Sequence, residues 1–206
     1  MQIIKEEDQN AISLAIDSLQ KGKIIAFASD TIYGLAVDAT NSKAVEALYE
    51  IKKRDSKKPI AIFVKNLKKA EEIFIFDEQS KRIAKKFFPG NLTLVLKTKI
   101  NNPAKLAPNL NKSHDGFLGF RIIDSEFTNN LFKKFDGILA VSSANFSNQE
   151  PAFDAKKVEE YFFNSDILLI DGGVSKNKIP STVIKFINNK IEIIRSGLIS
   201  ETELRF

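Results

Sequence analysis

A motif rich in hydroxyl groups lies close in the sequence to a cluster of positive charges. Ser29-Asp-Thr-Ile-Tyr-Gly-Leu35 follows the apolar run 24–27, which is typical of a buried strand. Open α/β sheets bind ligands at the carboxyl ends of their strands, where Ser29, Thr31 and Tyr33 are expected to emerge. A short helix later the chain supplies five cations, Lys52, Lys53, Arg54, Lys57 and Lys58. Lysine and arginine near hydroxyl groups predict a pocket for an anion, first of all a phosphate compound.

Standing alone, each half of this pattern also has a structural explanation. Gly34 is able to supply an unusual φ angle, Tyr33 to pack in the core, and Asp30 with Thr31 to close a turn. A run of lysines is more often a solvated face than a binding site. Taken without other motifs, segment 29–35 favours a structural role slightly over a functional one.

Further polar groups stand where other strands are expected to end. The apolar run 138–142 leads into Ser143-Ala-Asn145, which places neutral hydrogen-bonding groups at the same sheet edge as Thr31. Arg121 and Arg195 each end an expected strand, where arginine often extends to solvent. Each feature alone is explained by a turn, a helix cap or solvation. Two strand-terminal arginines, two hydroxyl clusters and a cationic helix end together indicate a site.

The composition removes several kinds of chemistry. The 206 residues include no cysteine and one histidine, which excludes disulfides, thiolate zinc sites, cysteine nucleophiles and multi-histidine metal clusters. A Ser-His-Asp triad would need His114, which lies in a turn-rich stretch expected to be a loop. The chain contains neither a P-loop motif nor Gly-x-Gly-x-x-Gly after a strand, so side chains and local turns must hold any nucleotide.

Charge and hydropathy bound the class of protein. The net charge of +5 favours anionic partners. No stretch approaches the roughly 20 apolar residues of a membrane span, and the polar, acidic start of the chain is unlike a secretory signal. These features predict a cytoplasmic protein with no membrane partner. The length predicts one domain over residues 1–206 with a sizeable core.

Apolar periodicity and helix-breaking residues predict alternating helices and strands. Helices are expected around 12–19, 42–54, 67–73, 78–88, 127–135 and 158–162, and the last turn of the second would carry Lys52, Lys53 and Arg54. Strands are expected around 24–28, 60–64, 92–97, 116–121, 138–142 and 167–170, with a hairpin of 182–186 and 191–194 turning at 188–189. Residues 99–116 form a long surface loop. This order predicts an α/β fold, with a twisted open sheet of mixed parallel and antiparallel strands flanked by helices.

Seven sequence blocks, in order and spacing, resemble the short form of the YrdC-like threonylcarbamoyl-AMP synthase family. The blocks span about residues 10 to 200, and they are Gly22–Leu35, Leu48–Arg54 with Lys58-Pro59, Phe88–Thr93, Gly119–Arg121, Ser142–Ser147, Ser181–Val183 and Ile194–Gly197. The resemblance implies the YrdC-like sheet with a basic concave cavity. It also implies synthesis of threonylcarbamoyl-AMP and pyrophosphate from L-threonine, bicarbonate or CO2, and ATP, for threonylcarbamoyladenosine at position 37 of tRNA.

The resemblance assigns residues to two substrates. The threonine side would use Thr31, Arg121, Ser143 and Ser181. The ATP side would use Arg54, Lys58, Asn145 and Arg195, and Lys52 and Tyr33 match neighbouring motif positions. The chemistry needs no enzyme nucleophile, so Arg54, Lys58, Arg121 and Arg195 would act by positioning and charge stabilisation. Mg2+ would accompany ATP with no protein ligand set, and the product would pass to a threonylcarbamoyl transferase complex.

Several flanking positions depart from the usual family pattern. Proline is replaced by Ala28, Asp55, Asn91, Ile123 and Ser196, and glycine by Asn148. These changes leave open an RNA-binding module of the same fold, holding tRNA or double-stranded RNA without adenylate-forming activity. A third alternative is the related domain of carbamoyl-transfer proteins in hydrogenase maturation. Those proteins carry cysteine-rich fingers, which a chain without cysteine cannot form.

Overall fold

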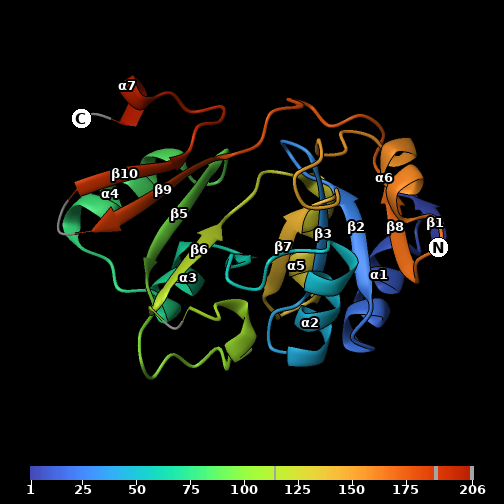
Figure 1. Ribbon diagram of the computed structural model, residues 1–206, viewed down its shortest axis with the longest axis horizontal. Helices are drawn as coiled ribbons and strands as arrows, with labels where there is room; N and C mark the ends of the chain where they lie inside the picture. The colour runs from blue at the N-terminus through green and yellow to red at the C-terminus, as the bar shows by residue number, and fades with distance from the viewer. Residues whose placement is uncertain (114, 188–189, 205–206) are drawn as a thin grey trace.

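The computed structural model describes residues 1–113, 115–187 and 190–204. Within these ranges ten strands form one mixed sheet in the order β1-β8-β2-β3-β7-β4-β6-β5-β9-β10. The strands are β1 (Gln2–Lys5), β2 (Ile24–Ala28), β3 (Tyr33–Asp38), β4 (Ala61–Phe63), β5 (Leu92–Lys97), β6 (Phe117–Arg121), β7 (Leu139–Ser143), β8 (Ile167–Asp171), β9 (Thr182–Ile187) and β10 (Lys190–Arg195). Figure 1 shows the β9–β10 hairpin at one end of the sheet and β1 at the other.

Seven helices and one short 3-10 turn accompany the strands within the described ranges. They are α1 (Ala11–Gln20), α2 (Ser42–Ile51), α3 (Leu67–Ile73), α4 (Glu78–Phe87), η1 (Pro108–Leu110), α5 (Glu126–Lys134), α6 (Ala155–Phe162) and α7 (Glu201–Leu204). Five of the helices begin at a side chain that accepts hydrogen bonds from free backbone amides of the first turn. These caps are Asn41, Asn66, Asp77, Ser125 and Asp154.

The helices form a layer on each face of the sheet. Helices α2, α3, α4 and α6 contribute apolar residues to one buried cluster, while α1 and α5 contribute to a second cluster that includes Phe63 and Val141. Both faces of the central strands are therefore covered, which explains why β2 is buried along its whole length. Beyond α1 and α5, the face of the sheet that carries Phe63 and Val141 also lines a cavity.

Most expected elements are present, and the predicted mixed α/β sheet is confirmed. Four elements had no counterpart in the sequence prediction: β1, β3, α7 and the turn η1, which lies within the expected loop 99–116. Segment 29–35 is therefore a hairpin connection that runs into β3, and Tyr33 starts β3 instead of following β2. The expected turn at 188–189 and His114 lie outside the described residues. One domain over 1–206 and a cytoplasmic location stay predictions.

Helix α2 ends before the cationic residues that were expected in its last turn. Lys53 adopts a positive φ of 50°, which stops the helix. The amide of Lys53 donates to the carbonyl of Glu50 at 2.9 Å, and the amide of Arg54 donates to that of Tyr49 at 3.0 Å. This pattern is a Schellman motif, with a lysine at the position that usually holds glycine. The motif turns Lys52 inward to the core and sends Arg54 toward the cavity.

None of the helices in the described ranges has the length and apolar character needed to cross a membrane.

Candidate functional site

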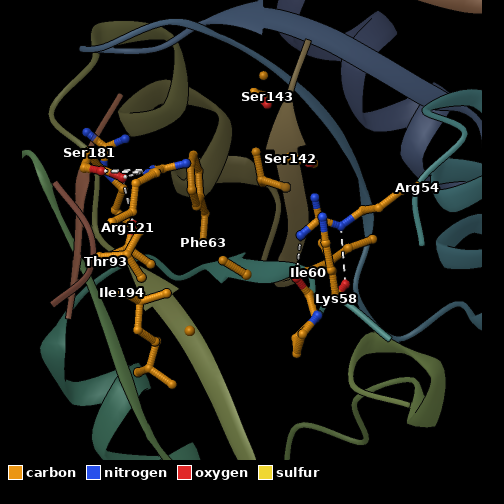
Figure 2. Close-up of a pocket in the computed structure, with 18 of the residues that line it drawn as sticks. Arg54, Lys58, Ile60, Phe63, Thr93, Arg121, Ser142, Ser143, Ser181 and Ile194 are labelled. Atoms are coloured by element: carbon orange, nitrogen blue, oxygen red, sulfur yellow. Dashed lines mark hydrogen bonds between the residues drawn. The ribbon is translucent and has the colours of Figure 1, made fainter. Parts of the chain in front are cut away.

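A cavity of about 660 Å³ opens on the α1 and α5 face of the sheet. Its floor is formed by residues of β4, β5, β6, β9 and β10, and its walls by the segments that precede β3 and β4 and by the last residues of β7. The charged residues that line it are Arg54, Lys57, Lys58, Arg121, Lys185, Arg195 and Asp115. Figure 2 shows Arg121 and Ser181 on one side of the cavity and Arg54 and Lys58 on the other.

Arg121, the last residue of β6, is the most enclosed cation of the cavity, with 3% of its surface exposed. Its Nη2 donates to Asp30 Oδ1 at 2.6 Å and to Asn91 Oδ1 at 3.3 Å, and its Nε donates to the carbonyl of Gly90 at 2.9 Å. Its Nη1 donates to Thr31 Oγ1 at 3.0 Å. These bonds occupy four of the five guanidinium N–H groups within the described structure. The remaining N–H is on Nη1, beside Thr31.

The hairpin between β2 and β3 holds Thr31 in place. Ser29 Oγ accepts from the amides of Thr31 and Ile32 at 3.1 and 3.2 Å, and donates to the carbonyl of Ile32 at 2.6 Å. Ser29 Oγ and Thr31 Oγ1 are also 3.0 Å apart. The small hydroxyl residues thus form a local side-chain turn, and Thr31 Oγ1 lies between Ser29 and Arg121. Thr31 therefore takes part in the turn that the sequence suggests and also contacts Arg121.

Ser181 and Arg195 form a second polar group at the same side of the cavity. Ser181 Oγ lies 2.8 Å from Thr93 Oγ1 and accepts from Arg195 Nη2 at 3.1 Å. Arg195 Nη2 and Nε also donate to the Ser181 carbonyl at 2.8 and 3.2 Å. Burial lowers the pKa of the Arg195 guanidinium from its usual value, and the positive charge of Arg54 lowers it further. The positive charge of Arg54 on one wall therefore repels that of Arg195 on the other.

Arg54 and Lys58 form the more open wall. Arg54 Nε donates to the carbonyl of Lys58 at 3.2 Å, and its Nη2 donates to that of Pro59 at 2.9 Å. No carboxylate in the described residues forms an ion pair with Arg54. Within the same ranges the exposed Lys58 amine has no hydrogen-bond partner. Two cations without a carboxylate leave positive charge for a ligand to neutralise.

Lys52 and Asn145 lie behind the cavity wall and do not line it. The Lys52 amine donates to the carbonyl of Ser143, to the carbonyl of Asn145 at 2.8 Å and to Asn145 Oδ1 at 3.0 Å. Asn145 Oδ1 also accepts from Ser143 Oγ at 2.6 Å, and its Nδ2 donates to the carbonyl of Gln149 at 2.6 Å. Burial lowers the pKa of Lys52 to about 7, and the charge of Arg54 adds to the effect. This buried cation supports the turn that carries Ser143.

The residues proposed from the sequence separate into three groups. One wall holds Thr31, Arg121, Ser181 and Arg195, and the other holds Arg54 and Lys58. In the third group Ser143 lines the cavity, while Lys52 and Asn145 lie behind it. Tyr33 is also among the residues that line the cavity, but its side chain belongs to the core cluster that contains α2 and α6. Its hydroxyl donates to the carbonyl of Gly173 at 2.7 Å and accepts from the amide of Gly172 at 3.1 Å.

Sequence reasoning missed the partners that hold Arg121. The sequence predicts only a turn role for Asp30 and only a strand position for Phe63. Asp30 pairs with Arg121, and the Arg121 guanidinium lies over the Phe63 ring at 5.9 Å. An acid between two hydroxyl residues at the end of a buried strand was the signal that could have indicated Asp30.

The chain matches known proteins along most of its length. The model of the Sua5/YciO/YrdC family, described as telomere recombination, matches residues 17–197. A Methanocaldococcus jannaschii relative is 31% identical over 95% of this chain and 89% of its own length. The threonylcarbamoyl-AMP synthase of Pyrococcus abyssi is 29% identical over 90% of this chain, which spans only 54% of that protein.

Solved structures agree with these matches. The crystal structure of P. abyssi Sua5 complexed with L-threonine superposes with a TM-score of 0.86 at 27% identity, over 95% of this chain and 57% of that chain. The crystal structure of Escherichia coli YciO gives a TM-score of 0.85 at 20% identity over 98% of this chain and 97% of its own, which supports the fold alone.

Proposed function

Because this chain belongs to the Sua5/YciO/YrdC family, we propose that it is a threonylcarbamoyl-AMP synthase, a nucleotidyltransferase that uses L-threonine, bicarbonate or CO2, and ATP. The observation that carries the proposal is the paired set of cationic walls. On one wall a buried Arg121 keeps one N–H beside the Thr31 hydroxyl, which suits a small carboxylate that also has a hydroxyl group. On the other wall Arg54 and Lys58 have no acidic partner among the described residues, which suits phosphates.

The reaction divides into two balanced steps. The neutral threonine amine adds to CO2 and loses one proton to give a carbamate; with bicarbonate the same carbamate forms and water leaves in place of that proton. A carbamate oxygen then attacks the α-phosphorus of ATP, forming the P–O bond of threonylcarbamoyl-AMP while the bond to pyrophosphate breaks. Neither step needs an enzyme nucleophile. Arg54, Lys58 and Arg195 would stabilise charge on the transferring phosphorus and the pyrophosphate, as arginine and lysine do in other phosphoryl-type transfers.

Threonine selection follows from the enclosed wall. Arg121 would bind the carboxylate, and Thr31 and Ser181 supply hydroxyls for the side-chain hydroxyl of threonine. Ser143 would extend this set from the opposite side of the cavity. An analogue without the hydroxyl would leave a buried group of the site unpaired, which is costly.

A magnesium ion would enter with the nucleotide. Within the described part of the chain no three acidic or histidine residues gather in a way that could hold a metal. Asp115 is the carboxylate that lines the cavity. This donor set fits Mg2+, which typically keeps several waters and binds mainly through substrate phosphates. When bound, the ion would neutralise phosphate charge.

The enclosed geometry favours an enzyme over an RNA-binding module. Arg121 is almost fully buried and committed to Asp30, so a folded RNA backbone has no access to it. The product would serve threonylcarbamoyladenosine formation in tRNA through a threonylcarbamoyl transferase complex. Direct binding of tRNA or double-stranded RNA would be an additional property, with exposed lysines as its source.

Pyrophosphate release by the purified protein tests the proposal. We expect release from ATP only when L-threonine and bicarbonate are both present, with AMP joined to the threonylcarbamoyl group detected by mass spectrometry. Serine is the control substrate, because it keeps the hydroxyl and lacks the methyl group. Release that is indifferent to threonine would reject the proposed activity, and salt-sensitive tRNA binding without nucleotide binding would favour the RNA-binding module.

A further inference from the structure

A β-bulge interrupts the last hairpin of the sheet. In the ladder of β9 and β10, Ile193 lies opposite Ile184, but the next paired residue is Arg195, opposite Val183. Ile194 is therefore an extra residue on β10. Bulges frequently occur at sheet edges next to active sites, where they redirect side chains.

The bulge lets two consecutive residues face the cavity. In a regular strand neighbouring side chains point to opposite faces, so only one of Ile194 and Arg195 would do so. Here both line the cavity, together with Val183 on the partner strand. Ile193, just before the bulge, instead packs against the core cluster that contains Ile184. The extra residue thus adds an isoleucine to the cavity without removing Arg195.

Ile194 extends an apolar strip of the cavity floor. The strip contains Ala61, Val95, Val183 and Ile194. A Cβ placed on Gly119 would lie within 3.5 Å of side-chain atoms of Thr93, Ala61 and Val95, so its absence keeps the floor flat there. Ile194 is 53% exposed, and Figure 2 shows its side chain on the same side of the cavity as Thr93 and Arg121. The strip offers contact area for a ligand group that carries no charge.

The proposed reaction indicates which part of the substrates would contact the apolar strip. Attack on the α-phosphorus requires that phosphate to lie next to threonine, hence near Arg121, Ser181 and Arg195. From there the β- and γ-phosphates extend toward Arg54 and Lys58. The nucleoside must leave the α-phosphate in another direction, and the floor beyond Arg195 is the apolar one. The base is the one large uncharged part of the two substrates.

We infer that the bulged Ile194 forms an apolar contact for the nucleobase and is a specificity residue for the nucleotide. This inference rests on the proposed function for the direction of the nucleotide. The bulge lets one short segment serve two parts of the ligand: Arg195 the α-phosphate and Ile194 the base.

Calorimetric binding of two ligands separates these contacts. The ligands are α,β-methylene-ATP, which has the base and cannot release pyrophosphate, and tripolyphosphate, which has only the charges. For Ile194→Ala we expect about tenfold weaker binding of the nucleotide, since a missing apolar contact is worth about that much. Tripolyphosphate binding should stay within about twofold, because the Arg54, Lys58 and Arg195 charges remain. Ile194→Val should restore most of the nucleotide affinity.

Two further variants keep the test independent of folding. Ile75→Ala removes an isoleucine of similar exposure, 51%, that does not line the cavity, and it should bind both ligands as the unmodified protein does. Deletion of Ile194 gives a regular ladder with Arg195 still opposite Val183, and it should reproduce the Ile194→Ala result. Melting temperatures of all variants identify any that fail to fold.

The outcomes distinguish the inference from the proposed function. Equal losses for nucleotide and tripolyphosphate would show that Ile194 only supports Arg195, and unchanged nucleotide binding would show that the base lies elsewhere; either result overturns the inference. Selective loss of nucleotide binding in a protein that releases no pyrophosphate would keep the base contact and reject the synthase activity.

Discussion

The two walls of the cavity hold their arginines in different ways. Arg121 is buried, ion-paired with Asp30 at 2.6 Å and bonded through four of its N–H groups. Arg54 donates hydrogen bonds to the carbonyls of Lys58 and Pro59 and has no ion-pair partner in the described residues, and Lys58 beside it is exposed. The Arg121 wall is a rigid hydrogen-bonded network in which one guanidinium N–H remains available. The Arg54 and Lys58 wall carries positive charge and has few hydrogen bonds that fix its side chains.

This difference suits two kinds of substrate group. A rigid donor set recognises a small molecule by shape and hydrogen-bond count, because its geometry is set before the ligand arrives. Loosely held cations instead attract a flexible polyanion and adapt to it, and their effect weakens as salt screens the charges. The comparison therefore predicts geometric sensitivity at Arg121 and charge sensitivity at Arg54 and Lys58.

The largest expected effect is that of Arg121→Lys. Lysine keeps the positive charge near Asp30 but cannot reproduce the planar fork that reaches Thr31, Gly90 and Asn91. We expect kcat/KM for threonine to fall by at least about a hundredfold, since a misplaced positioning group has an effect of this order. KM for ATP should change little. Initial rates of pyrophosphate release at varied threonine and ATP measure both values.

Arg82→Lys is the matched control for this variant, because Arg82 is exposed on helix α4 and outside the cavity. A threonine kcat/KM for Arg121→Lys close to that of Arg82→Lys would show that charge alone suffices on the buried wall. The contrast between the walls would then disappear.

The next effect concerns the open wall. Arg54→Ala and Lys58→Ala should each raise KM for ATP by about tenfold, the typical value of a charge-assisted hydrogen bond to an ionised ligand. The effect should shrink as salt rises from low to high concentration, because these side chains are accessible to ions. Lys58→Ala should not change the melting temperature by more than about 2 °C, since an exposed charge contributes little to stability.

Lys68→Ala provides the comparison, because Lys68 is an exposed lysine of helix α3 away from the cavity. An ATP KM that is insensitive to salt in the unmodified protein would mean that the open wall binds by fixed geometry, as the buried wall does.

The sequence predicted the fold well where one pattern dominated. The apolar runs of β2 and β7 located these strands to within one residue at each end. It missed β3, because Tyr33-Gly-Leu was attached to the preceding turn, and a strand buried on both faces lacks alternation. It placed Lys53 and Arg54 in helix α2 because a lysine in a left-handed conformation leaves no compositional mark.

Most of the residues proposed for the site lie around one cavity, whereas most of their contacts were not predicted. Thr31 follows β2 and Arg121 ends β6, as expected for side chains at the carboxyl ends of strands. Ser181 instead precedes β9, and it reaches the same side of the cavity because β9 runs antiparallel to β6. The burial of Lys52 was not expected, since a lysine cluster is usually solvated. The bulge at Ile194 was also missed, because its existence depends on register with β9, which one strand's sequence does not contain.

A smaller effect tests a second buried cation against Arg121. Lys52 is 1% exposed and, among the described residues, is surrounded by carbonyl oxygens with no carboxylate partner. Its pKa is about 7 in the folded protein against an ordinary 10.5, so the unfolded chain binds more protons between these values. The free energy of unfolding should therefore rise with pH from about 7 to about 10.5, by up to about 1 kcal/mol per pH unit.

Lys52→Met removes this proton linkage, because methionine does not titrate. Urea unfolding of both proteins at pH 7, 8 and 9 should give a steeper rise for the unmodified protein. Parallel curves would contradict the lowered pKa and indicate that the three oxygens keep the ammonium charged. Arg121 and Lys52 would then both remain charged in the core, Arg121 through its carboxylate partner Asp30 and Lys52 through carbonyl oxygens.

The smallest catalytic effect is expected for Tyr33→Phe. The Tyr33 hydroxyl joins β3 to Gly172 and Gly173, the start of the segment that runs along one side of the molecule to β9 in Figure 1. Burial raises the pKa of this hydroxyl, which therefore stays protonated and serves as a hydrogen-bonding group. Its loss should lower the free energy of unfolding by about 1 kcal/mol, because two partly buried hydrogen bonds, to the carbonyl of Gly173 and from the amide of Gly172, are removed. The KM values for threonine and ATP should change by less than about twofold, since the hydroxyl points away from both cationic walls; a larger change in the threonine KM alone would place Tyr33 in the rigid network of Arg121.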